Sequence, residues 1–413
     1  MTHRVVITGM GTINSLGHSV SETWENIIGG KSGVGPITLF DASEMLVRIA
    51  CEVKGFEPEK YMEAREARRR DRFQALASAA SQEALRQAGM DISKEDPSRV
   101  AVVVSTAIGG LTTLQDATLG MQAQGPRRVS PFVIPMFMPN GAAGLIAIDN
   151  GAKGPCFSVA SACASGADGI GQGWLIVRSG TADAAIVGAS DATITRIGIA
   201  AFDRLGALSR RNDEADRTPA PFDLERDGLV MGEGAAILVI ESLEHARARR
   251  APVLAELAGY AGTCDAFHVT APAENGEGGA MAIKMALESA GLRAEDIDYI
   301  NAHGTGTELN DLSETRAIKA ALGDHAYHVP ISSTKSMTGH MMGATGALEA
   351  ILCVQAILDG VVPPTIHYRT PDPKCDLDYV PNQARELPVR VALSNAFGFG
   401  GHNAVLAFRA FSD

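Results

Sequence analysis

Short apolar runs alternate with longer amphipathic stretches along most of the chain. The runs are rich in Val, Ile and Ala and carry few polar residues, which is typical of strands covered on both faces. We predict strands at Val5 to Thr8, Val100 to Ser105, Ala184 to Gly188, Ala236 to Glu241, Leu254 to Tyr260, Ile297 to Ala302, Val391 to Ser394 and Ala404 to Phe408. Helical stretches lie between them, and Ser19 and Glu22 can cap the first. The pattern predicts an α/β layered fold.

Two short patterns recur about half the chain apart. Ala84–Met90 and Ala286–Leu292 each end a predicted helix just before a strand. Ala164–Ala167 and Ala344–Ala347 each lie in the first part of a helix, one after a cysteine and the other after a histidine. The recurrence indicates a duplicated fold with corresponding helix N-termini, one bearing a thiol and the other an imidazole.

Composition and charge narrow the function classes. The chain has 413 residues, 46% of them hydrophobic and 20% charged, enough for two domains or one large duplicated domain. A net charge of -12 argues against general nucleic-acid binding. The six cysteines show no Cys-x-x-Cys spacing, which fits a reducing cytoplasm. Met341–Leu358 is nearly apolar but carries Glu349, so we expect a buried helix and no membrane span. The N-terminus reads as a strand without a secretion signal.

The stretch from Val159 to Gly166 carries the first candidate for chemistry. The residues before Cys163 suit a buried strand and those from Ala164 to Arg178 suit a helix, which places Cys163 on a tight turn at a helix N-terminus. Free N–H groups and the positive end of the helix dipole favour an anion there, so we predict a raised thiolate fraction. A small cysteine that only packs is the commoner situation for this residue type.

Two later segments supply candidate partners for this thiol. His303 ends a predicted strand in a Gly/Thr turn, where α/β folds place their sites. Lys335 and His340 lie on a predicted loop before the helix that contains Glu349. A lone histidine is more often structural, but two imidazoles in Gly-, Thr- and Ser-rich loops, one of them near a lysine and a buried glutamate, favour chemistry.

The segment Asn395–Gly401 places aromatic side chains in a glycine hinge. Such a hinge suits a mobile gate or a backbone donor to an oxyanion. A tight turn between two strands would explain the glycines, but it would not explain Phe397 and Phe399.

Together these motifs resemble those of the condensing enzymes, in particular the β-ketoacyl-[acyl-carrier-protein] synthase II type of fatty-acid synthesis. The resemblance runs from about residue 3 to 410 and rests on the segments around Cys163, Arg226–Gly228, Met231–Gly234, His303, Lys335–His340 and Phe397–Gly401. It implies the thiolase fold, a duplicated five-layer αβαβα architecture with halves 1–252 and 253–413. It also implies a homodimer without a metal or a redox cofactor.

The resemblance also implies roles for individual residues. Cys163 resembles the nucleophile that accepts an acyl chain from the phosphopantetheine of acyl carrier protein. His303 and His340 resemble the pair that binds the malonyl thioester and stabilises the enolate formed when carbon dioxide leaves. Lys335 resembles the lysine that tunes these histidines, and Glu349 its buried counter-charge. The implied reaction is a decarboxylating Claisen condensation with malonyl-acyl carrier protein, which gives β-ketoacyl-acyl carrier protein.

The same resemblance implies the surroundings of the reacting groups. The backbone N–H groups of Cys163 and Phe399 would form the oxyanion hole, with Phe399 and Gly400 in the gate. The other implied sites are an acyl pocket at Ile108, Ala162 and Phe202 with Phe137 from the other subunit, and a pantetheine channel at His268, Thr270, Thr305 and Thr307.

Arginines gather in two stretches of this otherwise acidic chain. A solvated face would explain such runs, and in the family they resemble the docking patch for an acidic carrier protein. The arginines concerned are Arg65, Arg68, Arg69, Arg70 and Arg72 in one stretch and Arg127 and Arg128 in the other.

Two positions depart from the family pattern. Gly206 stands where the family generally has an arginine, so one docking contact is missing unless Arg204 replaces it. Ile134–Pro139 is bulkier than expected for a segment that lines the acyl pocket, which leaves the preferred chain length open.

Other functions remain as alternatives. A ketosynthase subunit of a type II polyketide synthase would share every catalytic residue and differ in partner and substrate. A thiolase typically needs a second catalytic cysteine near the C-terminus, where this chain reads Phe399–His402. A non-catalytic chain-length partner would lack the nucleophile that Cys163 provides. The sequence leaves the pathway, and a homodimer or a heterodimer with a homologue, open.

Overall fold

A computed structural model describes residues 2–412 of the chain. The strands are β1 (Val5–Asn14), β2 (Gly35–Pro36), β3 (Ile49–Ala50), β4 (Val100–Ser105), β5 (Cys156–Phe157), β6 (Ala184–Asp191), β7 (Gly234–Ser242), β8 (Ala255–Cys264), β9 (Tyr299–Asn301), β10 (Ile331–Ser332), β11 (Val361–Val362), β12 (Arg385–Glu386), β13 (Val391–Gly398) and β14 (His402–Arg409). The helices are α1 (Val20–Ile28), α2 (Ala64–Ala67), α3 (Arg72–Ala88), α4 (Leu111–Gln124), α5 (Val133–Phe137), α6 (Gly141–Asn150), α7 (Ser165–Arg178), α8 (Arg196–Arg204), α9 (Leu243–Ala248), α10 (Glu277–Ala290), α11 (Glu308–Leu322), α12 (Lys335–Thr338) and α13 (Gly343–Asp359). Every strand predicted from the apolar runs is present.

The main sheet contains the same five-strand arrangement twice. Its order is β10-β9-β13-β14-β8-β1-β7-β6-β4-β5. In each half the first three strands from the outer edge are parallel to one another and the next two pairings are antiparallel. Within the sheet, β1 and β8 join the two halves through two residue pairs. The repeated order and strand directions confirm the duplication expected from the sequence.

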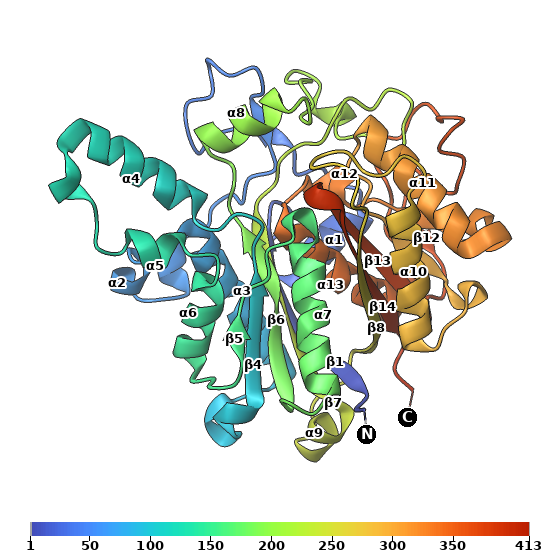
Figure 1. Cartoon of the computed structure of the whole chain (residues 1–413), viewed down its shortest axis with the longest axis horizontal. Helices are drawn as coiled ribbons and strands as arrows, with labels where there is room; N and C mark the ends of the chain where they lie inside the picture. Colours follow the sequence, from blue (N-terminus) through green and yellow to red (C-terminus); the bar gives the residue numbers. More distant parts are fainter. Residues whose placement is uncertain (1, 413) are drawn as a thin grey trace.

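Helices and sheet halves stack in five layers, as Figure 1 shows. Helices α7 and α13 lie in the centre and contact strands of both halves. Helices α3 and α6 cover the outer face of the first half, and α10 and α11 lie over the outer face of the second. The largest apolar cluster surrounds the two central helices, and nearly all of α13 is buried. The αβαβα architecture is therefore confirmed.

The recurring sequence patterns occupy equivalent places in the two halves. Helices α3 and α10 each end on a glycine in the left-handed region, Gly89 with φ 60° and Gly291 with φ 65°. The second pattern places Gly166 of α7 against α13, where an added Cβ would lie 2.4 Å from the carbonyl oxygen of Gly343. Gly346 of α13 faces α7 in return. Small residues at these positions let the two central helices approach closely.

The sequence prediction was wrong about the strand that precedes Cys163. Strand β5 ends at Phe157, and the chain then runs without regular structure to a 3₁₀ turn at Ala162–Ala164. This strand is short and half-exposed because it lies at the edge of the sheet and pairs only with β4.

None of the helices in residues 2–412 is long and apolar enough to cross a membrane.

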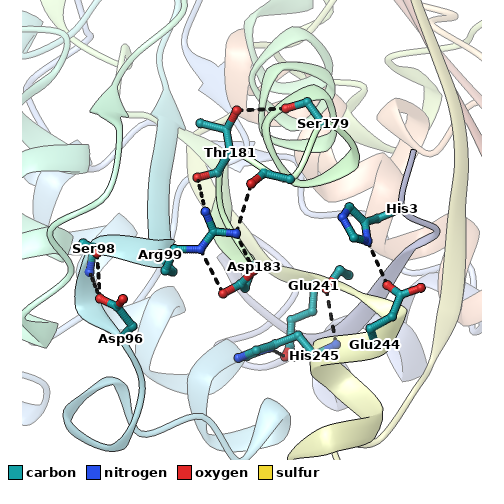
Figure 2. A network of polar contacts seen from close by, with 12 residues as sticks. His3, Asp96, Ser98, Arg99, Ser179, Thr181, Asp183, Glu241, Glu244 and His245 are labelled. Carbon is teal, nitrogen blue, oxygen red and sulfur yellow. Dashed lines mark hydrogen bonds and ion pairs between the residues drawn. The ribbon is translucent and has the colours of Figure 1, made fainter. Parts of the chain in front are cut away.

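A polar cluster lies at the end of the sheet opposite the start of α7 (Figure 2). His245 of α9 lies between two carboxylates, with Nδ1 2.6 Å from Glu241 Oε2 and Nε2 3.1 Å from Glu95 Oε2. Close by, Arg99 binds Asp183, with 2.6 Å between Nη2 and Oδ1. These bonds fasten α9 and the end of β7 to the segment that enters β4. The hydrogen bond with Glu241 raises the pKa of His245.

Candidate active site

Cys163 lies on a strained turn in front of the central helix α7. The residue before it, Ala162, has φ of 50°, a left-handed conformation that alanine seldom adopts. Cys163 itself is 8% exposed. The strained turn brings the thiol to the N-terminal end of α7, as the sequence predicts for a nucleophile.

Hydrogen bonds from the first helical turns hold this bend in place. Ser165 Oγ accepts from the N–H of Ser161 at 2.9 Å and donates to the carbonyl oxygen of Ala162 at 2.6 Å. Asp168 Oδ2 accepts from Ser161 Oγ at 2.5 Å, and its Oδ1 accepts from the Tyr260 hydroxyl at 2.7 Å. Tyr260 comes from β8, so the second half of the fold supports the turn that carries the thiol. No local pattern predicts this contact, because it joins residues far apart in the chain.

The protonation state of Cys163 differs from the sequence prediction. Burial raises the pKa of its thiol to about 11, against the opposing effects of the Lys335 charge and of the N–H groups of Phe399 and Cys163. The desolvation of the thiolate therefore outweighs the helix N-terminus, and the resting enzyme carries a neutral thiol. The two N–H groups lie close enough to the sulfur to favour its thiolate form.

Two buried histidines face the cysteine from the second half of the fold. The rings of His303 and His340 meet edge to face, with centroids 5.4 Å apart and planes at 84°. One ring nitrogen of each and the Cys163 sulfur lie within 4.8 Å of one another. Burial, and then the charge of Lys335, lowers the pKa of both imidazoles well below the ordinary value. Both histidines are therefore neutral at physiological pH.

The predicted lysine and glutamate form an ion pair behind the histidines. Lys335 Nζ donates to Glu349 Oε1 at 2.6 Å, and both side chains are 1% exposed. Burial raises the pKa of Glu349 to about 7, while the adjacent Lys335 acts in the opposite direction. Lys335 does not lie on a loop, as the sequence suggested, but begins the one-turn helix α12. The Gly/Ser/Thr-rich composition concealed this short helix.

A second buried carboxylate orders the loop of His303. Glu314 of α11 accepts from the N–H of His303 at 2.8 Å and of Gly304 at 2.7 Å. It also accepts from Asn395 Nδ2 at 3.2 Å. Burial raises the pKa of Glu314 to about 7. Glu314 was not predicted from the sequence, because Ser-Glu-Thr-Arg in a helix is typical of a solvated face.

A third buried carboxylate, Asp191, anchors the segment that contains Ile108. It lies at the end of β6 and accepts from Thr106 Oγ1 at 2.6 Å and from the N–H of Ala107 at 3.0 Å. Burial raises the pKa of Asp191 to about 6. Like Glu314, it was not singled out in the sequence, because only the fold shows that it is buried.

A cavity of about 300 Å³ leads to the three reacting side chains. Thr270, Thr305 and Thr307 line it, as predicted for a pantetheine channel. His268 does not, because its exposed ring turns back to accept the N–H groups of Thr270 and Ala271, both at 3.1 Å.

The predicted acyl pocket is only partly visible in this cavity. Of its four residues, Phe202 lines the cavity, whereas Ile108, Ala162 and Phe137 do not. The ring of Phe202 stacks on that of Phe399, with centroids 6.3 Å apart. The gate segment is tied to the neighbouring loop, since the N–H of Gly400 donates to the carbonyl oxygen of Val269 at 2.8 Å.

The predicted docking arginines fall into two groups. Those that reach solvent are Arg65, Arg68, Arg127 and Arg128, together with half-buried Arg69, which stacks 4.6 Å from the Phe132 ring. The prediction was wrong for Arg70 and Arg72, which do not face a docking partner. They form ion pairs within the chain, with Asp149 at 2.7 Å and Glu233 at 2.6 Å respectively. At the cavity mouth Leu205, Gly206 and Ala207 present no charge, and Arg204 beside them is exposed.

Comparison with known proteins identifies the class. The beta-ketoacyl synthase N-terminal domain matches residues 2–246, and the beta-ketoacyl synthase C-terminal domain matches residues 254–369. The chain belongs to the beta-ketoacyl synthase family, which confirms the resemblance to the condensing enzymes. It is 49% identical over 408 residues to the 3-oxoacyl-[acyl-carrier-protein] synthase 2 of Synechocystis sp. strain PCC 6803, covering 99% of this chain and 98% of the relative.

Solved structures give the same result for the fold. A type II polyketide ketosynthase bound to a hexaketide, in complex with its acyl-carrier protein, superposes with a TM-score of 0.93 at 36% identity and covers all of both chains. The ishigamide ketosynthase/chain length factor superposes with a TM-score of 0.94 at 39% identity, again over all of both chains.

Proposed function

We propose that this protein extends acyl chains in fatty-acid synthesis by a decarboxylating Claisen condensation. An acyl group on Cys163 reacts with malonyl-acyl carrier protein to give β-ketoacyl-acyl carrier protein and carbon dioxide. One observation carries the proposal: a thiol and two neutral imidazoles lie within 4.8 Å of one another at the cavity. The 49% identity to a 3-oxoacyl-[acyl-carrier-protein] synthase 2 favours the fatty-acid pathway.

The first half-reaction loads the acyl chain. Cys163 Sγ attacks the acyl thioester, a new C–S bond forms, and the bond to the pantetheine sulfur breaks. Because burial raises the pKa of the thiol to about 11, its proton leaves as the C–S bond forms and ends on the departing pantetheine thiolate. The N–H groups of Cys163 and Phe399 stabilise the negative oxygen of the tetrahedral intermediate.

The second half-reaction uses the two imidazoles. N–H groups of His303 and His340 donate to the thioester carbonyl of the malonyl group, whose bond to the carboxylate breaks with release of carbon dioxide. The resulting carbanion attacks the acyl carbonyl, the C–C bond forms, and the C–S bond to Cys163 breaks. Cys163 leaves as a thiolate and takes up one proton from solvent, which regenerates the neutral thiol. Neutral donors suit this step, because a positively charged imidazole would protonate the carbanion. Burial keeps both rings neutral, and the charge of Lys335, which is paired with Glu349, acts in the same direction.

Acyl carrier protein delivers both substrates in this proposal. Its pantetheine arm enters past Thr270, Thr305 and Thr307, and its acidic surface docks on Arg65, Arg68, Arg69, Arg127 and Arg128. A similar solved ketosynthase is in complex with its acyl-carrier protein, which supports this type of partner. The substrates arrive on phosphopantetheine, so the proposed reaction uses no metal or redox cofactor.

We also propose that two copies of the chain form a homodimer. Helix α4 has no buried residue and extends away from the rest of the chain, with Leu114, Leu119 and Met121 exposed (Figure 1). Strand β5 also leaves one edge unpaired within residues 2–412. A second copy covering these surfaces would place Phe137 next to the acyl pocket of its neighbour. The halves 1–252 and 253–413 would act as one unit in each subunit, in a reducing cytoplasm that keeps the six cysteines free.

A ketosynthase subunit of a type II polyketide synthase is the second candidate. The solved ketosynthases of that class, at 36% and 39% identity, favour it. A thiolase is less well supported, because Phe399–His402 offers no second cysteine, and a non-catalytic chain-length partner is less well supported, because Cys163 is present.

Mass spectrometry of the purified chain with acyl- and malonyl-carrier protein tests the function. We expect an acyl adduct on Cys163 and a product longer by one two-carbon unit, both lost in Cys163→Ala while the protein stays folded. Elongation only after addition of a homologous cysteine-less subunit would favour the polyketide alternative. Undiminished elongation by Cys163→Ala would exclude the mechanism.

A further inference from the structure

The three reacting side chains also have the composition of a soft-metal site. Cys163, His303 and His340 each offer one sulfur or ring nitrogen, and these three atoms lie within 4.8 Å of one another in a buried setting. Nδ1 of His303 is buried and has no hydrogen-bond partner among the described residues. Nδ1 of His340 lies 3.0 Å from Thr345 Oγ1, which leaves Nε2 for a ligand. A thiol and two imidazoles are the ligand types that Zn²⁺ and Cd²⁺ favour.

We propose that Cys163, His303 and His340 bind one soft divalent metal ion, such as Zn²⁺ or Cd²⁺, and that this ion inhibits the enzyme reversibly. The site provides three protein ligands, and the cavity beside them admits a water molecule as the fourth. Ligands at about 2.0 to 2.3 Å from a tetrahedral ion lie about 3.5 Å apart, so side-chain movements of about 1 Å close the site. Hard ions such as Mg²⁺, which prefer oxygen ligands, do not fit it.

The charges around the site set the conditions for binding. Both imidazoles are neutral and bind without losing a proton, whereas the Cys163 thiol releases one proton to solvent as the metal–sulfur bond forms. Lys335 opposes a second cation, but its charge is paired with Glu349 at 2.6 Å. The carboxylate Asp191 lies close enough to Cys163 to act on its charge and favours a cation there.

Metal binding and acyl loading exclude each other in this proposal. Both use the Cys163 sulfur, and the thioester of the acyl-enzyme has no thiolate to offer. Metal should therefore compete with the acyl donor, and a preformed acyl-enzyme should resist it. The competition rests on the proposed function, whereas binding to the three side chains does not, so the two can fail separately.

Cadmium titration tests the site without an activity assay. The full-length chain is used with Cys156→Ser and Cys264→Ser, because these are the exposed thiols among residues 2–412. Binding is followed by calorimetry and by the ultraviolet charge-transfer band of a cadmium thiolate. We expect one equivalent of Cd²⁺, loss of the band in Cys163→Ser, and at least about tenfold weaker binding in His303→Ala and His340→Ala. Cd²⁺ should also slow alkylation of Cys163 by iodoacetamide, and a chelator should restore it.

Three results would overturn the proposal. The band could persist in Cys163→Ser, which would place the ion on another thiol. Affinity could be unchanged in both histidine variants, which would reduce the site to an ordinary single thiolate. Alkylation of Cys163 could continue at its full rate with one equivalent of Cd²⁺ bound. Circular dichroism spectra of the variants that match that of the parent protein show that each variant is folded, so a change in binding reports the lost side chain.

Discussion

The two halves of the fold share a topology but present different chemistry at the centre. In the first half, Cys163 precedes α7, and in the second, His340 precedes α13. A left-handed residue stands just before each helix, Ala162 with φ 50° in one half and Met342 with φ 50° in the other. The duplicated backbone thus offers two similar helix starts next to one cavity, and the proposed mechanism assigns the nucleophile to one and a hydrogen-bond donor to the other.

Burial shifts the pKa values of the thiol and of the imidazoles in opposite directions, and both shifts favour the neutral form. It raises the pKa of the Cys163 thiol and lowers the pKa of the His303 and His340 imidazoles. Each shift favours the neutral form, because a charge is poorly solvated there. The three side chains therefore start uncharged, and in the proposed mechanism N–H groups from both halves stabilise negative charge as it develops.

The largest expected effect is a loss of condensation without a loss of acyl loading, caused by substitutions in the second half of the fold. His303→Ala or His340→Ala should slow condensation by about 10²- to 10⁴-fold, because the enolate loses an N–H donor. The acyl adduct on Cys163 should still form and can be detected by mass spectrometry. If both steps fail equally in a folded variant, the histidines are not confined to the malonyl step.

Removing one member of the buried ion pair should destabilise the second half strongly. Lys335→Met leaves Glu349 without its partner and should cost about 3 to 5 kcal/mol in the free energy of unfolding. The loss should be smaller at low than at high pH, because a protonated carboxyl needs no counter-charge, and without Lys335, which lowers the pKa of Glu349, this carboxyl keeps its proton to higher pH. Urea unfolding measures both values.

A surface lysine provides the matched control for this experiment. Lys319→Met removes a partly exposed pair with Asp376 and should cost less than about 1 kcal/mol. Equal losses for Lys319→Met and Lys335→Met would show that burial does not determine the effect.

Glycine-to-alanine substitutions at the contact between α7 and α13 should destabilise the protein to different extents. An added Cβ at Gly166 would lie 2.4 Å from a backbone oxygen of α13, whereas at Gly346 the nearest atom would be 3.1 Å away. Gly166→Ala should destabilise the protein by about 1 to 3 kcal/mol, and Gly346→Ala by clearly less, because alanine also favours the helix. Thermal unfolding of both variants distinguishes them, and equal losses would contradict the asymmetry.

A smaller effect is expected at the surface of the first half. Reversing Arg65 and Arg68 to Glu should raise the KM for carrier-bound substrate several-fold and leave kcat nearly unchanged. The defect should shrink at high salt or with a small pantetheine thioester, because the lost interaction is long-range attraction. Arg293→Glu, at the end of β9 opposite His303, is the control. Equal losses on carrier-bound and small substrates would place these arginines outside the docking surface.

The smallest effect concerns the polar cluster around His245. Since the pKa of His245 is raised in the folded state, its contribution to stability is full below the unfolded value near 6.5 and is lost as pH rises through the raised pKa. His245→Gln should therefore lower the melting temperature more at pH 5.5 than at pH 8.5. A loss independent of pH would show that the charged imidazole is not what binds Glu241 and Glu95.

Much of this architecture could be predicted from the sequence, because local patterns carry it. The apolar runs marked the strands, and the repeated Ala/Gly patterns marked equivalent helix ends in the two halves. Cys163, His303 and His340 stood out because glycine-rich turns surround them. These signals are local, so the residues at each position suffice to reveal them.

The remaining features depend on contacts between distant segments. The bond from Tyr260 to Asp168, and the burial of Asp191 and Glu314, follow only from the assembled layers. The same is true of the high pKa of Cys163, since the sequence shows a helix N-terminus but not the depth of burial. Arg70 and Arg72 were misread as surface charges because their partners lie far along the chain.

The division of labour between the two halves is tested most directly by decarboxylation in Cys163→Gln. The glutamine amide takes the place of the acyl thioester before the N–H groups of residues 163 and Phe399, and it cannot accept an acyl chain. We measure conversion of malonyl- to acetyl-carrier protein by mass spectrometry, without an acyl donor. Decarboxylation at or above the wild-type rate, with no condensation, is the predicted result. Loss of decarboxylation together with condensation, in a folded protein, would contradict the assignment of that step to His303 and His340.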